Sequence, residues 1–124
     1  MVFLYNVHFY KDKNGKEPVV DYLRELKSKN NKDSQIKLRK IQDYINILKE
    51  YGTRAGEPYM KHLDGDIWEL RPGSNRVLFA AWYRDSFVLL HSFVKKAQKT
   101  PVMEIDQAKR ELADLIERSE KPKI

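Results

Sequence analysis

Apolar residues at helical spacing mark two segments in the first half of the chain. The first segment follows Pro18, which suits the first position of a helix. Its apolar residues fall at i, i+3, i+4 and i+7: Val19, Tyr22, Leu23 and Leu26. After a polar connection over residues 28–33, the second segment repeats this spacing and ends at Gly52, a helix stop signal. Its apolar residues are Leu38, Ile41, Ile45 and Leu48. The pattern predicts two amphipathic helices that pack together as a hairpin.

A period of two, typical of strands, occurs on both sides of these helices. Residues 2–10 are rich in β-branched and aromatic types and precede the turn signal Lys13-Asn14-Gly15, which predicts a first strand. From residue 59 onward the apolar period changes from 3.6 to 2. Four further strands are predicted there, over residues 59–63, 67–71, 76–83 and 87–94. Because only tight turns separate these strands, and parallel neighbours would need long crossovers, we expect this part of the sheet to be antiparallel.

A third helix closes the chain. Thr100 is placed as its N-cap and Pro101 at its first position. Its apolar residues keep helical spacing: Ile105, Ala108, Leu112 and Leu115. Residues 119–124 are expected to form a frayed tail. The order of elements predicts one α+β domain over residues 1–124, in which the helical hairpin covers one face of a four- to five-stranded sheet. The opposite, partly concave face is then expected to be open to a ligand or partner.

The composition fits a globular domain and excludes several classes of protein and site. Of the 124 residues, 41% are hydrophobic and 34% are charged, which is too apolar for a disordered chain. No apolar run reaches the roughly 18 residues of a membrane-spanning helix, so no membrane partner is expected. Cysteine is absent, which excludes disulfides, cysteine-based zinc sites and cysteine nucleophiles. The first residues lack the features of a secretory signal, so a cytoplasmic location is expected.

The net charge of +6 raises the expectation of a polyanionic partner, and the predicted sheet contains a candidate binding surface. In the second of the four predicted strands, period two places Trp68 and Leu70 toward the core. Glu69 and Arg71 then point to the open face. Arg76 begins the next strand just beyond a turn, which brings a second guanidinium next to the first. Two arginines placed in this way can bind a phosphate.

Three lysines extend this basic surface, because Lys95, Lys96 and Lys99 follow the last predicted strand directly. Two plainer interpretations stay open at this point. Glu69 and Arg71 would form an exposed ion pair that contributes little, and the lysines would belong to an ordinary solvated turn.

The three histidines are scattered along the chain, and their spacing does not suggest a metal site. His91 lies in an apolar strand, where a packed role is more common than a catalytic one. His62 lies beside Lys61 in a polar stretch and is the better candidate for an exposed proton-transfer group. Phosphate-binding loops, zinc-protease motifs and hydrolase motifs are absent from the sequence, so no metal is predicted.

Between residues 59 and 110 the sequence resembles a known family. The segments that carry the resemblance are Lys61-His62-Leu63, Ile67-Trp68-Glu69-Leu70-Arg71, Asn75-Arg76-Val77-Leu78-Phe79, Leu89-Leu90-His91-Ser92-Phe93-Val94-Lys95-Lys96 and Gln98-Lys99-Thr100-Pro101, with Ala108 in the last helix. Together they resemble the HigB-type, phage-derived branch of the RelE/ParE toxin superfamily. The chain departs from the family pattern at Ile67, where Leu is common, and at Ser92, where Gly is common. Neither departure falls on a charged position.

The resemblance implies a RelE-like fold and the toxin of a type II toxin-antitoxin pair, an endoribonuclease that cuts mRNA in the ribosomal A site and so inhibits translation and growth. It also implies a HigA-like helix-turn-helix antitoxin as partner, operator DNA as a ligand of the complex, and neither a cofactor nor a metal. Residue by residue, Glu69 matches the acidic position of the family motif. The basic positions are matched by Arg71, Arg76, Lys95 and Lys96.

The chemistry that these residues support is attack of an RNA 2′-OH on the neighbouring phosphate, which needs a base, cations and an acid. We expect Arg71 and Arg76 to hold the scissile phosphate, and Glu69 or His62 to move the proton. Lys95 and Lys96 are expected to steer the RNA backbone and to stabilise charge in the reaction. The residues expected to bind the RNA are Lys61, Lys99 and His91. The alternatives are a ParE-like inhibitor of DNA gyrase and a basic module that binds nucleic acid without cleaving it.

Overall fold

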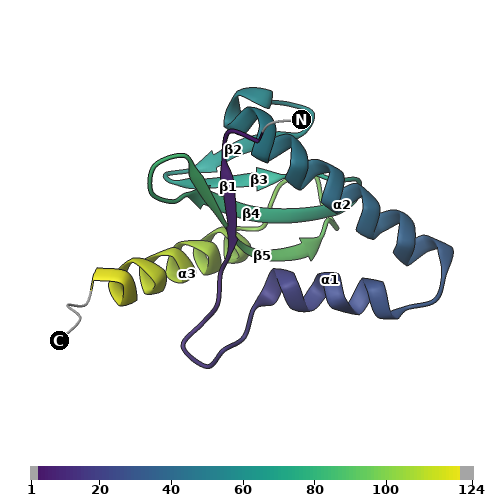
Figure 1. Cartoon of the computed structure of the whole chain (residues 1–124), viewed down its shortest axis with the longest axis horizontal. Coiled ribbons are helices and arrows are strands. Elements are labelled where there is room, and N and C mark those ends of the chain that lie inside the picture. Colours follow the sequence, from purple (N-terminus) through teal and green to yellow (C-terminus); the bar gives the residue numbers. More distant parts are fainter. Residues whose placement is uncertain (1–2, 121–124) are drawn as a thin grey trace.

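The sheet at the centre of the molecule has five strands in the order β1-β5-β4-β3-β2, with helices against it (Figure 1). The computed structural model describes residues 3–120. The strands are β1 (Asn6–Phe9), β2 (Met60–Asp64), β3 (Ile67–Leu70), β4 (Asn75–Ala81) and β5 (Ser86–Val94). The helices are α1 (Pro18–Ser28), α2 (Lys32–Tyr51), the short 3-10 helix η1 (Gly52–Ala55) and α3 (Val102–Glu120). The predicted α+β fold, with a mostly antiparallel sheet and a C-terminal helix, is confirmed.

The sheet combines an antiparallel meander with one parallel edge. From β2 to β5 each strand pairs with the next in antiparallel fashion, as the short turns predict. β1 instead runs parallel to β5, with Asn6 opposite Ser86, because the helices and the meander carry the chain back between them. β1 is shorter than the predicted strand over residues 2–10, of which residue 2 lies outside the described part of the chain. Tyr10 lies beyond β1, although its N–H still donates to the Leu89 carbonyl at 2.8 Å.

Local signals set the ends of α1 and α2. Pro18 occupies the start of α1, where the missing N–H of proline leaves no hydrogen bond unmade. α2 begins slightly earlier than predicted, because the Asn31 side chain caps it by accepting the Ser34 N–H at 2.8 Å. Gly52 ends α2 with a φ of +64°, and a Cβ at this position would lie 2.9 Å from the Tyr5 ring. Both the backbone conformation and the available space therefore require glycine here.

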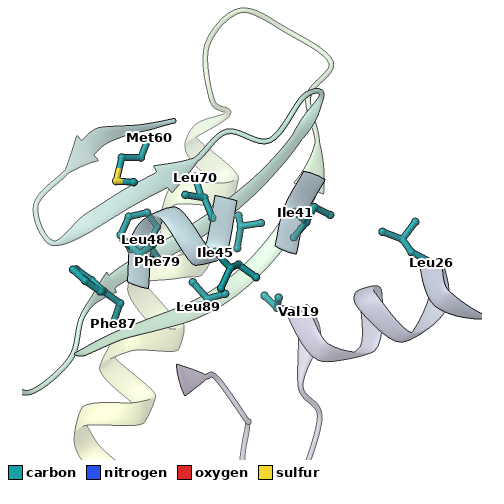
Figure 2. Close-up of a cluster of buried hydrophobic side chains, with 11 residues drawn as sticks. Val19, Leu26, Ile41, Ile45, Leu48, Met60, Leu70, Phe79, Phe87 and Leu89 are labelled. Carbon is teal, nitrogen blue, oxygen red and sulfur yellow. The ribbon is translucent and has the colours of Figure 1, made fainter. Parts of the chain in front are cut away.

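The helical hairpin covers one face of the sheet, as predicted, and Figure 2 shows the apolar side chains between them. The buried residues of this cluster are Val19, Leu26, Ile41, Ile45, Leu48, Met60, Leu70, Val77, Phe79, Phe87 and Leu89. Trp68 packs against the cluster, in agreement with its predicted place on the core side of β3. Burial of each large apolar side chain contributes about 1.5–3 kcal/mol, so this cluster is a major source of stability.

α3 covers the second face of the sheet, which corrects the expectation that this face is open. The buried residues of the second cluster are Tyr10, Ile67, Leu78, Ala80, Val88, Leu90, Ala108 and Leu112. The reason lies in β4 and β5, which are apolar at consecutive positions and therefore present apolar side chains on both faces. Glu69 is two positions from Ile67 along β3 and so points to the face that α3 covers.

The two ends of α3 differ from the prediction. Thr100 does not act as its N-cap, because the threonine hydroxyl donates to a carboxylate on β3 instead. The Pro101 carbonyl accepts the N–H groups of Glu104 and Ile105 at 3.0 and 3.4 Å, so Pro101 precedes the helix and does not occupy its first position. Ser119 and residue 120 belong to α3, and only residues 121–124 of the predicted frayed tail lie outside the described residues. No helix within residues 3–120 is long and apolar enough to cross a membrane.

Candidate functional site

Two adjoining pockets bring together eight of the nine site residues predicted from the sequence. The first, here called the β5 pocket, has a volume of about 410 Å³, and its basic lining residues are Arg76, Lys95, Lys96 and Lys99. The second, here called the β2 pocket, has a volume of about 330 Å³. The predicted residues that line it are Lys61, His62, Glu69, Arg71 and Lys99. Gln98, Lys99 and Thr100 line both pockets, so the loop between β5 and α3 separates one pocket from the other.

Glu69 lies beneath this loop and connects the charged groups of the two pockets. Its side chain is only 2% exposed, which corrects the expectation of a carboxylate on an open face. One carboxylate oxygen, Oε1, is 3.5 Å from Nε of Arg71 and 3.7 Å from Nε of Arg76. The other, Oε2, accepts the hydroxyl hydrogen of Thr100. Both carboxylate oxygens are therefore occupied, which leaves Glu69 poorly placed to take a proton from a ligand.

Arg76 is a fixed positive charge at the base of the β5 pocket. Its side chain is 8% exposed, and its Nη1 group donates to the carbonyls of Gly73 and Asn75 at 2.7 and 2.8 Å. Burial lowers the pKa of Arg76, and the charge of Arg71 lowers it further, while the Glu69 carboxylate acts in the opposite direction. A guanidinium nevertheless stays protonated at neutral pH. Arg76 thus supplies a positive potential, and its guanidinium is held in place by the backbone carbonyls of the preceding turn.

Arg71 is the more accessible of the two arginines. Its side chain is 24% exposed, and Nη1 lies 3.2 Å from Oε1 of Glu57, which is itself largely exposed. An exposed ion pair of this kind is weak, so a phosphate group can replace Glu57 at little cost. The sequence-based expectation that Arg71 and Arg76 lie close together agrees with their shared partner, Glu69.

The lysines of the site surround the pockets at different depths. Lys95 is half-buried, and its backbone N–H donates to the Ser74 carbonyl at 2.7 Å. Lys61, Lys96 and Lys99 are exposed. Long flexible side chains at the rim of a concave basic surface attract polyanions over a distance and still adapt to their shape.

His62 is an exposed residue of β2 whose ring orientation is fixed. Its Nε2 lies 2.7 Å from the carbonyl oxygen of Gly65, and its ring centroid lies 5.2 Å from that of Trp68. Because a carbonyl only accepts hydrogen bonds, Nε2 must carry the hydrogen, and Nδ1 of the neutral ring keeps its lone pair. A ring in this tautomer can accept a proton at Nδ1.

His91 does not join the pockets, which corrects its expected role as an RNA contact. The residue is 4% exposed because α3 covers its part of β5, in agreement with the packed role that its apolar strand suggested. Nδ1 lies 2.6 Å from a carboxylate oxygen of Glu111, and Nε2 lies 3.0 Å from one of Glu104. Since carboxylates accept hydrogen bonds, this arrangement is that of a doubly protonated ring that fastens α3 to the sheet.

The stability of the protein is expected to fall as the pH rises above about 6.5, because of His91. Burial alone disfavours the charged ring, but Glu111 and Glu104 outweigh burial and raise the pKa of His91 above its ordinary value of 6.5. The protonated ring stabilises the folded protein fully at pH values below 6.5, the ordinary pKa that applies in the unfolded chain. This stabilisation is lost as the pH rises through the higher pKa of the folded state. Urea unfolding at about pH 6 and about pH 9 measures it, and His91→Gln should flatten the pH dependence. An equally steep dependence in His91→Gln would assign it to other groups.

Sequence reasoning missed several contacts of the site. The hydroxyl of Tyr22 in α1 donates to Oδ1 of Asn75 at 2.7 Å, and no local pattern pairs residues so far apart. The place of Thr100 before Pro101 predicts a helix cap, and no local signal indicates its contact with the carboxylate of Glu69. Within residues 3–120, no group of three or more His, Asp or Glu side chains is arranged to hold a metal ion.

Comparisons with known proteins relate the chain to one family and one fold. The model of the family described as "Phage derived protein Gp49-like (DUF891)" matches residues 21–113. Among solved structures, the crystal structure of the archaeal RelE-RelB complex from Pyrococcus horikoshii OT3 contains a similar chain, with a TM-score of 0.51 and 18% sequence identity. The similarity covers 75% of this chain and 97% of that one, and at this identity it is a similarity of fold. No curated protein matches the sequence significantly.

Proposed function

Because this chain belongs to the Gp49-like family of phage-derived proteins, we propose that it is the toxin of a type II toxin-antitoxin system that cleaves mRNA on the ribosome. The motifs between residues 59 and 110, which resemble those of HigB-type toxins, support the proposal. The similarity of the fold to a chain of the archaeal RelE-RelB complex is a second support.

The observation that carries the proposal is the grouping of cationic side chains and one histidine in two adjoining pockets. Arg71 and His62 line the same pocket, and Arg76 lies behind Glu69 at the base of the other. Exposed lysines surround them. Excess positive charge in a concave surface attracts and orients phosphate groups, while the histidine provides an imidazole for general-base catalysis.

In the proposed reaction, the 2′-oxygen of one nucleotide attacks the adjoining phosphorus, and the bond from phosphorus to the 5′-oxygen of the next nucleotide breaks. The products are a 2′,3′-cyclic phosphate and a 5′-hydroxyl group. His62 takes the 2′-OH proton at Nδ1, and Arg71 donates hydrogen bonds to the phosphate oxygens as negative charge develops on them. The ammonium groups of Lys61 and Lys99, at the same pocket, are candidates to protonate the leaving 5′-oxygen.

Glu69 has a different role in this proposal from the one expected from the sequence. Because Arg71, Arg76 and Thr100 occupy its carboxylate, Glu69 holds the two guanidinium groups in place and leaves proton transfer to His62. Ion pairs with a buried carboxylate restrict the orientation of an arginine that must meet a phosphate.

The proposed partners follow from the same assignment. A HigA-like helix-turn-helix antitoxin would neutralise the toxin and bring the complex to operator DNA, and the ribosome would place the reaction in the cytoplasm. Acidic residues of the antitoxin would fit the basic rim of the two pockets if it covers them directly. A complex structure in which both pockets remain open would show that neutralisation works by another route.

Inducible expression in bacteria, followed by primer extension on one message, tests the proposed function. The message is compared with the same message whose start codon has been removed, so that only the first is translated. We expect growth arrest and cuts on the translated message alone. Growth arrest without cuts would favour inhibition of gyrase, and salt-sensitive RNA binding without cuts or arrest would favour a binding module.

A further inference from the structure

The turn Pro72–Asn75, which leads from β3 into β4, joins Arg71 to Arg76 in the chain and is hydrogen-bonded to the backbone of Lys95. Arg71 precedes it and Arg76 follows it in the chain. Nη1 of Arg76 donates to the carbonyls of Gly73 and Asn75, and the N–H of Lys95 donates to the Ser74 carbonyl. Any displacement of this turn therefore displaces charged groups in both pockets.

Tyr22 of α1 holds the turn from the opposite side. Its hydroxyl donates to Oδ1 of Asn75 at 2.7 Å, and Asn75 is only 2% exposed. Burial raises the pKa of Tyr22, so the phenol keeps its hydrogen and remains a donor at neutral pH. Tyr22 lines neither pocket, so its contact with the site passes through Asn75.

We propose that Tyr22 is a positioning residue for the cleavage site, and that it acts by fixing the turn Pro72–Asn75 through its hydrogen bond to Asn75. The inference rests on the proposed function, since it assigns Tyr22 a role in the same reaction. The backbone carbonyl of Asn75 accepts from Arg76, while the side chain of Asn75 accepts from Tyr22. Orientation of Asn75 by Tyr22 is thus transmitted to the guanidinium of Arg76. Displacement of a catalytic group by about 1 Å lowers rates by up to about 100-fold, so a small shift of this turn suffices.

The chain offers a closely matched control for this hydroxyl. Tyr10 is a buried residue, and its hydroxyl donates to Oδ2 of Asp114 at 2.6 Å in a partly buried hydrogen bond, as that of Tyr22 does to Asn75. This bond joins the segment after β1 to α3, and neither Tyr10 nor Asp114 lines a pocket. Tyr10→Phe and Tyr22→Phe each remove one hydroxyl and one hydrogen bond between side chains. If only Tyr22→Phe lowers the rate of cleavage, the effect is due to where its hydrogen bond lies, and not simply to the loss of a hydrogen bond.

The experiment measures cleavage of ribosome-bound mRNA by purified wild type, Tyr22→Phe, Tyr10→Phe, Asn75→Ala and the double variant Tyr22→Phe/Asn75→Ala. Urea unfolding of each protein confirms that it is folded. We expect Tyr22→Phe to lower kcat about three- to tenfold with KM unchanged, which corresponds to loss of one ordinary hydrogen bond. Tyr10→Phe should keep the wild-type kcat. The double variant should be no slower than Asn75→Ala, because both substitutions break the same connection.

Equal rates for Tyr22→Phe and Tyr10→Phe would overturn the positioning role, and so would additive losses in the double variant. Both outcomes require a wild-type protein that cuts mRNA. If the wild type does not cut, the proposed function fails, and the role of Tyr22 fails with it. The wild-type measurement therefore separates failure of the function from failure of the inference.

Discussion

Replacing Arg71 by alanine is expected to lower mRNA cleavage by about 100- to 1,000-fold while the fold stays intact, because one donor to a developing anion contributes about this much. Arg71 is the accessible arginine of the β2 pocket, which His62 also lines. Its removal leaves Glu69 with Arg76 and Thr100 as partners. Single-turnover cleavage of ribosome-bound mRNA measures the effect, and urea unfolding checks the fold.

Two further substitutions make this result specific. Arg71→Lys keeps the charge but not the planar, two-pronged donor, so it should recover only part of the activity. Arg84→Ala removes an exposed arginine from the β4–β5 turn, which lines neither pocket, and should leave cleavage unchanged. Full activity in Arg71→Ala, or an equal loss in Arg84→Ala, would contradict the assignment of Arg71 to the scissile phosphate.

Replacing Arg76 by alanine is expected to destabilise the fold by about 3 kcal/mol, at the lower end of the range for breaking a buried ion pair. Arg76 and Glu69 have side chains that are 8% and 2% exposed, so the substitution leaves a buried carboxylate with less compensation. The loss stays near the lower end because Arg71 and Thr100 still contact Glu69. The free energy of unfolding in urea measures it.

The matched variant for this prediction replaces both charges. Arg76→Met combined with Glu69→Leu removes the pair and leaves no buried charge, so it should be more stable than Arg76→Ala alone. The double variant should still lack cleavage activity, because it removes a cation and the group that orients Arg71. If Arg76→Ala unfolds at the urea concentration of the wild type, the ion pair has no structural role.

The fold could be predicted largely because its elements are encoded locally. The apolar spacing of α1 and α2, the stop at Gly52 and the short turns of the meander each act within a few residues. The coverage of the second sheet face does not follow from Trp68, Glu69, Leu70 and Arg71, because their alternation alone makes the face of Glu69 and Arg71 look polar. Ile67 lies on the face of Glu69 and is buried, and this residue, with the apolar runs of β4 and β5, was the available signal.

The sequence predicts which residues gather at the site, but not how deeply each of them is buried. Its charged residues gather because they lie on β2, near the β3–β4 turn and after β5, which adjoin in a meander. Burial of Glu69 and Arg76 depends on where the loop before α3 passes, and that path is set by contacts between distant residues. Thr100 shows the conflict directly, since the carboxylate of Glu69 displaces the local role of a helix cap.

The parallel pairing of β1 with β5 also determines when the sheet can form during synthesis of the chain. Asn6 lies opposite Ser86, so β1 has no partner until β5, about 80 residues later in the chain, has been made. Closing so long a loop slows folding relative to local pairing. The lysines that follow β5 and the loop that covers Glu69 emerge later still. The charged cluster therefore cannot assemble on a nascent chain until β5 and the loop that follows it have left the ribosome.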